Sequence, residues 1–380
     1  MEHNSKLPNV KTTIFTVMGK LAKEHNAINL SQGFPDFDVD PKLIELVTKA
    51  MKNGFNQYAP MQGAIELREQ ISIKFDDLYN VNYNPETEIT ITAGATQAIF
   101  TIISTFIHQD DEVIIFKPAY DCYEPAIELN KGKSILIQLE APNYSVDWNK
   151  VKEHISSKTK MIIINTPHNP SGSVWSKQDM IQLEALVKGT NIIVLSDEVY
   201  EHIIFDENPH QSVCKFLYLK EQSFVVASFG KTFHTTGWKM GYCVAPAKFM
   251  YEFRKVHQFN VFCANHPYQI AFAEYLKNPN SYLNINSFYQ DKRDFFLNAI
   301  KDSRFKFIPS SGTYFQLLDY SAITNESDIK FAQRLVKEYR LAAIPISVFN
   351  TNHNDNKMLR FCFAKKKETL ERAAEILCDI

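Results

Sequence analysis

The fold is decided by an apolar run that ends in a lysine, Ser223-Phe224-Val225-Val226-Ala227-Ser228-Phe229-Gly230-Lys231. Residues 223–229 have the composition of a buried strand. In α/β folds, ligands bind in the crevice at the carboxyl ends of such strands. The amine of Lys231 is therefore placed to form a Schiff base with an aldehyde cofactor, if its surroundings lower its pKa. Because an isolated lysine lies far more often in a solvated loop, this prediction depends on the rest of the chain.

Between about residues 85 and 245, short apolar runs alternate with longer amphipathic ones. This alternation is typical of β-α units around a mostly parallel, buried sheet that helices cover on both faces. The predicted strands are 88–92, 112–116, 134–138, 161–164, 191–195, 224–227 and 241–245, and the predicted helices include 43–53, 95–106 and 177–187. The pattern indicates an α/β fold.

After about residue 280 the pattern changes to that of an α+β segment. It predicts a long amphipathic helix over 281–302, strands at 305–308, 312–317 and 358–363, and a helix near 328–338. No Pro/Gly-rich linker precedes it, so we expect this second domain to pack closely on the first.

The composition excludes several classes of partner. The 380 residues are 45% hydrophobic and carry a net charge of −2, which suits one large or two ordinary globular domains without an electrostatic footprint for nucleic acid. No window approaches the length of a membrane span, and the first residues lack the apolar core of a signal peptide. The six cysteines lie singly, without the spacing of metal or redox sites. We therefore expect a cytoplasmic protein with reduced thiols, no metal and a small-molecule partner.

Two polar residues follow strands that look buried. Asp197 follows the apolar run 192–195 after one serine. An unpaired carboxylate there would cost several kcal/mol, so it needs a cation, a metal or a set of donors. A protonated pyridine nitrogen would suit it, and the alternative is a helix N-cap. Asn169 lies in a turn with two prolines after the run 161–164. Such a turn holds one side chain in place, although Asn before Pro is also common in ordinary turns.

Other residues could complete a ligand site. The small-residue turn before Ala95 and Thr96 would let backbone N–H groups bind a phosphate at a helix N-terminus, a weak signal by itself, to which Ser228 and Lys239 could add a hydroxyl and a charge. Tyr120 follows a strand and could stack on a flat cofactor or be an ordinary core residue, and Tyr200 adds a phenol near Asp197. Arg360, between apolar residues, suits a carboxylate of a substrate or of the protein.

In the order Asn169, Asp197, Tyr200, Lys231, Arg360, the chain resembles the class I/II aminotransferases of the pyridoxal-phosphate fold type I superfamily, over nearly its whole length. Within them it is similar to the branch of methionine aminotransferases and of kynurenine aminotransferase/glutamine transaminase K. The stretches that carry this similarity are 12–16, 29–37, 120–125 and 230–241. Many members of the wider class have arginine where this chain has Lys239.

The resemblance implies a large cofactor domain over 41–280 and a small α+β domain formed by residues 1–40 and 281–380. It implies that Lys231 carries pyridoxal 5′-phosphate, that Asp197 pairs with its ring nitrogen, and that Tyr120 stacks on the ring. The remaining implied contacts are Asn169 and Tyr200 to the ring oxygen, Ala95, Thr96, Ser228 and Lys239 to the phosphate, and Gly33, Asn169 and Arg360 to the substrate. Tyr58 would reach the phosphate from a second subunit, which implies a homodimer with shared active sites.

The implied reaction transfers the amino group of methionine or a related neutral or aromatic amino acid to a 2-oxo acid by a ping-pong mechanism. In it Lys231 moves the proton and Tyr200 and Asp197 assist. The candidate lining of the side-chain pocket is aromatic and nearly neutral, which suits a thioether, but Phe15 and Phe262 could equally be ordinary core. This lining comprises Phe15, Tyr58, Tyr120, Phe262 and His266.

Two alternatives remain open. The first is a kynurenine/glutamine-type aminotransferase with cysteine-S-conjugate β-lyase activity, which would use the same residues. The second is a non-catalytic regulator that binds the cofactor, which would need an attached DNA-binding domain. The roughly forty residues before the large sheet-containing domain are too few for a winged helix and not basic enough, so we expect an enzyme.

Overall fold

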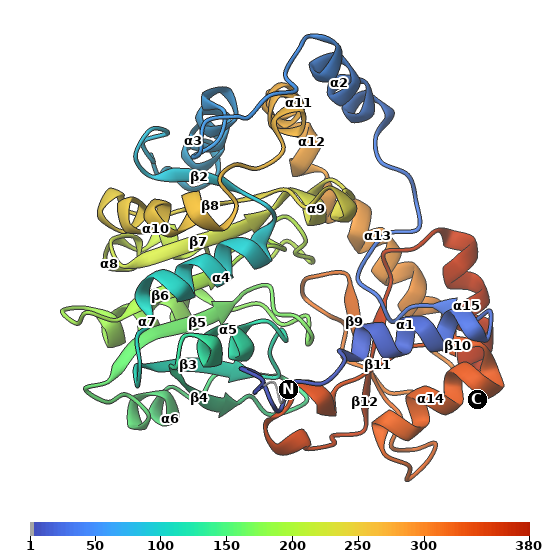
Figure 1. Ribbon diagram of the computed structural model, residues 1–380. Coiled ribbons are helices and arrows are strands. Elements are labelled where there is room, and N and C mark those ends of the chain that lie inside the picture. The colour runs from blue at the N-terminus through green and yellow to red at the C-terminus, as the bar shows by residue number, and fades with distance from the viewer. Residues whose placement is uncertain (1–3) are drawn as a thin grey trace.

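A central sheet of seven strands runs in the order β2-β8-β7-β6-β5-β3-β4 (Figure 1). The computed structural model describes residues 4–380. All neighbouring strands pair in parallel except β8, which is antiparallel to β2 and β7. The strands are β2 (Ile89–Thr92), β3 (Glu112–Lys117), β4 (Lys133–Gln138), β5 (Thr159–Asn165), β6 (Ile193–Asp197), β7 (Ser223–Ser228) and β8 (Gly241–Val244). The mostly parallel sheet predicted from the sequence is confirmed.

Helices cover both faces of this sheet because successive strand residues point to opposite sides. On one face, Val113, Ile163 and Phe224 belong to a cluster with α4, α5 and α10. On the other, Ile114 and Ile162 belong to a cluster with helices that include α3 and α7. The helices of this part are α2 (Pro41–Lys52), α3 (Ile65–Tyr79), α4 (Ala95–Phe106), α5 (Tyr123–Leu129), α6 (Trp148–Glu153), α7 (Lys177–Val187), α8 (Leu217–Lys220), α9 (Phe229–Thr232), α10 (Ala247–Asn260) and α11 (His266–Leu276).

Two smaller sheets lie outside the central one, and one of them joins the two ends of the chain. β1 pairs in parallel with β10, and an antiparallel sheet has the order β11-β12-β9. Figure 1 shows α1 beside these C-terminal elements. Their bounds are α1 (Ile14–Glu24), β1 (Ile28–Asn29), α12 (Asn280–Leu283), α13 (Ile285–Ala299), β9 (Phe315–Asp319), α14 (Asp328–Tyr339), β10 (Leu341–Ala342), β11 (Ile344–Pro345), β12 (Met358–Cys362) and α15 (Lys367–Asp379). The domain boundaries at residues 40 and 280 stay predictions.

Three predicted elements need correction. The helix predicted over 281–302 is two helices that break at Asn284, a residue type that favours caps over helix interiors. Residues 305–308 form no strand, since only Lys306 bridges to Asp319 and the following Pro309 has no N–H to donate. The strand predicted from residue 312 begins at Phe315, because Thr313 has a left-handed φ of 64°.

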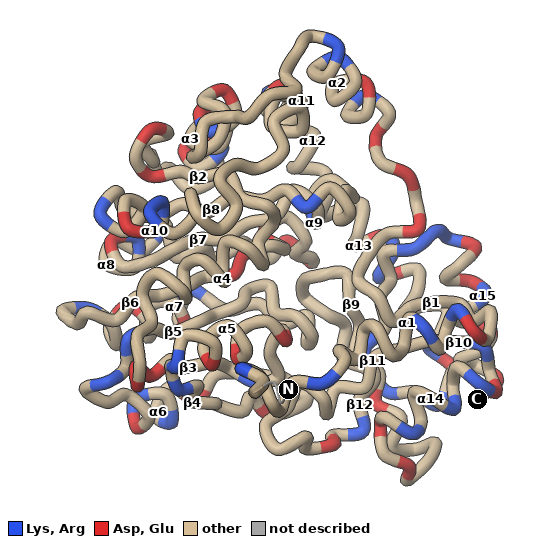
Figure 2. The backbone as a smooth tube through the Cα atoms, in the orientation of Figure 1, with Lys and Arg blue, Asp and Glu red and all other residues tan. Residues whose placement is uncertain are grey.

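Charged residues of both signs are interspersed around the outer helices, whereas the sheet is nearly free of them (Figure 2). All six cysteines are free thiols. Within residues 4–380, no helix is both long and apolar enough to cross a membrane.

Candidate active site

A cavity of about 200 Å³ lies at the ends of β5, β6 and β7 and at the start of α4. Because parallel strands end at one edge of the sheet, their last residues Asn165, Asp197 and Ser228 come together there. Of the predicted residues, those that line it are Ala95, Thr96, Tyr120, Asn169, Asp197, Tyr200, Ser228, Lys231 and Lys239. A larger cavity of about 380 Å³, beside Tyr144 and residues 306–311, contains none of them.

Asp197 is a buried carboxylate that no cation neutralises. Its Oδ2 accepts a hydrogen bond from the Tyr123 hydroxyl at 2.6 Å, and its Oδ1 accepts one from the backbone N–H of Val199 at 3.3 Å. Burial raises its pKa to about 6, although both hydrogen bonds act in the opposite direction. Within residues 4–380 no lysine or arginine lies within ion-pair distance of it. The N-cap alternative is wrong, because turns and not a helix follow Asp197.

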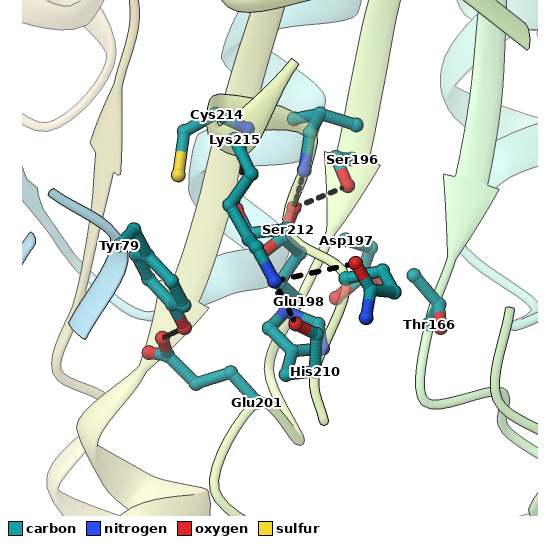
Figure 3. A network of polar contacts seen from close by, with 12 residues as sticks. Tyr79, Thr166, Ser196, Asp197, Glu198, Glu201, His210, Ser212, Cys214 and Lys215 are labelled. Carbon is teal, nitrogen blue, oxygen red and sulfur yellow. Dashed lines mark hydrogen bonds and ion pairs between the residues drawn. The ribbon is translucent and has the colours of Figure 1, made fainter. Parts of the chain in front are cut away.

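Two further buried carboxylates, Glu198 and Glu201, hold the segment after Asp197 in place through contacts with neighbouring residues (Figure 3). Glu198 accepts hydrogen bonds from the Ser196 hydroxyl at 2.7 Å and the Val213 N–H at 3.2 Å. Glu201 binds the ammonium of Lys74 and accepts from the Tyr79 hydroxyl at 2.9 Å. These contacts lie away from the cavity, so Asp197 and Tyr200 are left to face it.

Lys231 lies in α9, directly after β7, and its side chain is half-buried. Its Nζ donates to the Tyr314 hydroxyl at 2.9 Å and to the carbonyl oxygen of Gly33 at 3.3 Å. The pKa of Lys231 is lowered to about 8, mainly by burial and to a smaller extent by the nearby cations Arg360 and Lys239. An amine with this pKa is partly unprotonated near neutrality, as a nucleophile or a base requires.

The start of α4 forms the anion-binding part of the cavity. Its N-cap is Gly94 with a left-handed φ of 78°, and no side chain caps the helix, so the first N–H groups are open to a ligand. A Cβ on Gly94 would lie 3.6 Å from Nζ of Lys239, which shows how near that ammonium comes to the turn. Helix dipole and lysine therefore present positive potential at one point.

Arg360, from β12, is 1% exposed. Its Nη1 donates to Oδ1 of Asn169 at 2.6 Å and its Nη2 to the carbonyl oxygen of Ser31 at 3.1 Å, while its Nε is buried without a hydrogen-bond partner. The guanidinium carbon lies 3.9 Å from the ring centroid of Phe315 and 5.3 Å from that of Phe15. The predicted residues Arg360 and Asn169 are thus bonded directly to each other, and Nε of Arg360 is left without a partner.

The sequence model of the family "Aminotransferase class I and II" matches residues 25–377, nearly the whole chain. The chain belongs to this family. It is 48% identical to the methionine aminotransferase of Escherichia coli, over 98% of this chain and 97% of that protein. It is also 32% identical to human kynurenine–oxoglutarate transaminase 3, over 98% of this chain and 89% of that one. The crystal structure of an E. coli methionine aminotransferase superimposes with a TM-score of 0.98 and 47% identity, covering both chains fully.

The protein is therefore a transaminase, and the fold type I expectation is confirmed. Its own chain does not bring every predicted residue to the cavity. Tyr58 is 81% exposed and packs edge-on against Phe262, whose exposed fraction is 46%. His266 bonds the carbonyl oxygen of Gln57 instead. Gly33 contacts Lys231 through its carbonyl oxygen, and Phe15 lies beside Arg360.

Three further residues of this aminotransferase site were not predicted. Asn165 donates to the carbonyl oxygen of Asp197 at 2.9 Å and accepts from the N–H of Asn169 at 2.8 Å. A polar residue at the end of an apolar strand was a signal that could have identified it. Tyr123 and Tyr314 gave no such signal, because their contacts join segments far apart in the sequence.

Proposed function

We propose that this aminotransferase binds pyridoxal 5′-phosphate in the 200 Å³ cavity and moves the amino group of methionine and related neutral or aromatic amino acids to a 2-oxo acid. The proposal rests on three features that lie around the same cavity. A lysine amine of lowered pKa, a buried carboxylate without a cation and an uncapped helix N-terminus face one cavity.

The donor set fits that cofactor. When bound, pyridoxal 5′-phosphate supplies an aldehyde for amines and a ring that accepts electrons when it is protonated. Asp197 matches a ring N–H, since it is a buried carboxylate that still needs a cation. Lys231 would bind the aldehyde carbon. The other residues that would hold the group are Tyr120, Asn169 and Tyr200 around the ring, and Ala95, Thr96, Ser228 and Lys239 at the phosphate.

The substrate carboxylate would bind Arg360. Its Nε has no hydrogen-bond partner and offers one donor, and Nη1 and Nη2, which now bind Asn169 and Ser31, offer more if these bonds rearrange. This anchor would hold the Cα–H bond beside Lys231. With a pKa near 8, that amine takes the Cα proton and later returns one, the role of a general base and acid.

Preference for a thioether or aromatic side chain rests on two observations. The E. coli relative at 48% identity is named a methionine aminotransferase. Among the described residues that line the cavity, none is an arginine that would bind a second carboxylate, and Phe15 and Phe315 flank Arg360. Sulfur of methionine packs favourably on aromatic rings.

We also propose a homodimer with shared active sites. Tyr58 and Phe262 form an exposed aromatic pair that does not reach the cavity of its own chain. Such a pair is accounted for if it completes the cavity of a second copy. The cytoplasmic location expected from the sequence stays a prediction.

Borohydride reduction tests the cofactor site. Reduction of the loaded enzyme should attach the cofactor to the peptide that contains Lys231, as mass spectrometry would show. Attachment at another lysine would overturn the assignment.

A substrate panel with one fixed 2-oxo acid tests specificity. Methionine should exceed kynurenine and glutamine in kcat/KM, whereas the reverse order would support the kynurenine-type alternative suggested by the human relative. Turnover of cysteine conjugates without any 2-oxo acid would indicate β-lyase activity.

A further inference from the structure

Tyr314 is a fully buried phenol whose hydroxyl contacts the amine of Lys231. Three distant segments meet at this contact. Lys231 follows β7, Tyr314 directly precedes β9, and Gly33 follows β1. Among the described residues, the Tyr314 hydroxyl and the Gly33 carbonyl are the two hydrogen-bond partners of Lys231 Nζ.

The direction of these hydrogen bonds is determined by Gly33. The Tyr314 hydroxyl donates its one proton to the Gly33 carbonyl oxygen at 2.6 Å. Toward Lys231, 2.9 Å away, it can therefore act only as an acceptor. Burial raises the pKa of Tyr314 well above 10, so the phenol keeps the proton that it donates.

An acceptor pair of this kind stabilises the charged form of a lysine. A hydrogen bond to a charged group is stronger than one to a neutral group, so both oxygens favour the ammonium over the free amine. Burial acts in the opposite direction. The other titratable or charged groups around the amine are Asp197, Arg360, Lys239, Cys362 and Tyr200.

We propose that Tyr314 is a positioning residue for the known reaction, which holds the amine of Lys231 against Gly33 whenever that amine is not bound to the cofactor. The phenol does not contact the reacting carbon in this proposal. It keeps the free lysine in one place and keeps it basic enough to carry a proton. The inference rests on the proposed role of Lys231.

The test compares Tyr314→Phe with Tyr289→Phe. Tyr289 is equally buried, its ring centroid lies 5.6 Å from that of Tyr314, and its hydroxyl bonds His234 and not Lys231. Each variant loses one buried hydroxyl, but only the first loses a partner of Lys231. Unfolding temperatures would be measured for both, and Tyr314→Met would replace Tyr314→Phe if the latter failed to fold.

The readout is the pH dependence of acylation of Lys231 by acetic anhydride, followed by peptide mass spectrometry. The full-length enzyme would be loaded with pyridoxine 5′-phosphate, whose alcohol in place of the aldehyde leaves the lysine free. In Tyr314→Phe the pH of half-maximal labelling should fall by about one, the effect of losing one hydrogen bond to a charged group. In Tyr289→Phe it should stay at the parent value.

Identical labelling curves for the parent and Tyr314→Phe, or an equal shift in Tyr289→Phe, would overturn the inference. Neither outcome depends on transamination. If borohydride attaches the cofactor to Lys231 while the labelling curve does not move, the inference alone fails. If borohydride attaches the cofactor elsewhere, the proposed function fails whatever the labelling shows.

Discussion

Asp197 is the residue whose charge matters most for the proposed chemistry. Asp197→Asn keeps the size of the side chain and can keep a hydrogen bond with Tyr123, but it removes the negative charge that would hold a protonated ring. We expect the rate of the amino-acid half-reaction to fall by about 10²-fold or more, as when a preorganised electrostatic contact is lost. Stopped-flow spectroscopy would measure it.

Asp110→Asn is the control, because Asp110 pairs with Lys133 in an exposed ion pair. Its half-reaction should match that of the parent. An Asp197→Asn enzyme as fast as the parent would show that the buried carboxylate has no electrostatic role.

The altered pKa values predict how stability depends on pH when the cofactor is absent. For Asp197 the folded pKa of about 6 exceeds the ordinary 3.8, so this group makes the fold less stable as pH rises through 4 to 6. For Lys231 the folded pKa of about 8 lies below 10.5, so stability falls as pH drops from about 10.5 to 8. Both groups therefore destabilise the cofactor-free protein at pH 7.

Lys231→Met should accordingly stabilise the cofactor-free protein. A charge that burial disfavours is replaced by an apolar chain of similar length. If the charge costs about 1 kcal/mol, Tm at pH 7 rises by roughly 2 °C, and this gain should vanish above pH 10.5. Differential scanning calorimetry at pH 7 and pH 11 would measure both values, and a lower Tm at pH 7 would contradict the expectation.

At the scale of elements, the start of β8 decides where α4 begins. A Cβ on Gly241 would lie 2.7 Å from the carbonyl oxygen of Ala227 and 3.0 Å from the backbone nitrogen of Ala95. Gly241→Ala should push the helix start away from the sheet, at a cost of about 1–3 kcal/mol. The Kd for pyridoxal 5′-phosphate should then rise at least about tenfold.

Gly237→Ala is the matched control, because a Cβ there meets nothing within 4 Å. Equilibrium binding followed by absorbance would compare the two variants. Equal affinity in both would show that the position of α4 does not govern cofactor binding.

Strands with a continuous apolar run and helices with apolar residues at helical spacing were predicted well from the sequence. β5, β6 and β7 are apolar on both faces, and α4 and α7 have the predicted bounds. The predicted cavity residues Asn169, Asp197, Tyr200, Ser228 and Lys231 lie at or just after the ends of these strands, so strand order brings them together. The bond from Arg360 to Asn169 could not be predicted, since it depends on how the C-terminal sheet meets the loop after β5. The contact of Tyr314 with Lys231 escaped prediction for the same reason.

At the scale of the whole molecule, mixing two variants tests whether the two subunits of the proposed dimer share their active sites. Lys231→Ala should be inactive and Tyr58→Ala impaired. In a mixed dimer with shared sites, Lys231 of one subunit faces an intact Tyr58 of the other, so activity should recover to at most about a quarter of the parent's. No recovery after subunit exchange would indicate that Tyr58 serves no second subunit. Light scattering should give twice 43.8 kDa for the parent.

The pairing of β1 with β10 has a consequence for synthesis on the ribosome. Ile28 has Leu341 as its partner, and that partner is made more than three hundred residues later. At about 5–20 residues per second, the amino-terminal segment therefore waits roughly 15–60 s for its strand partner, and by then all seven strands of the central sheet have been made. Chains stalled near residue 300 should lose this segment to a protease before they lose the sheet, and equal resistance of both would contradict that order of assembly.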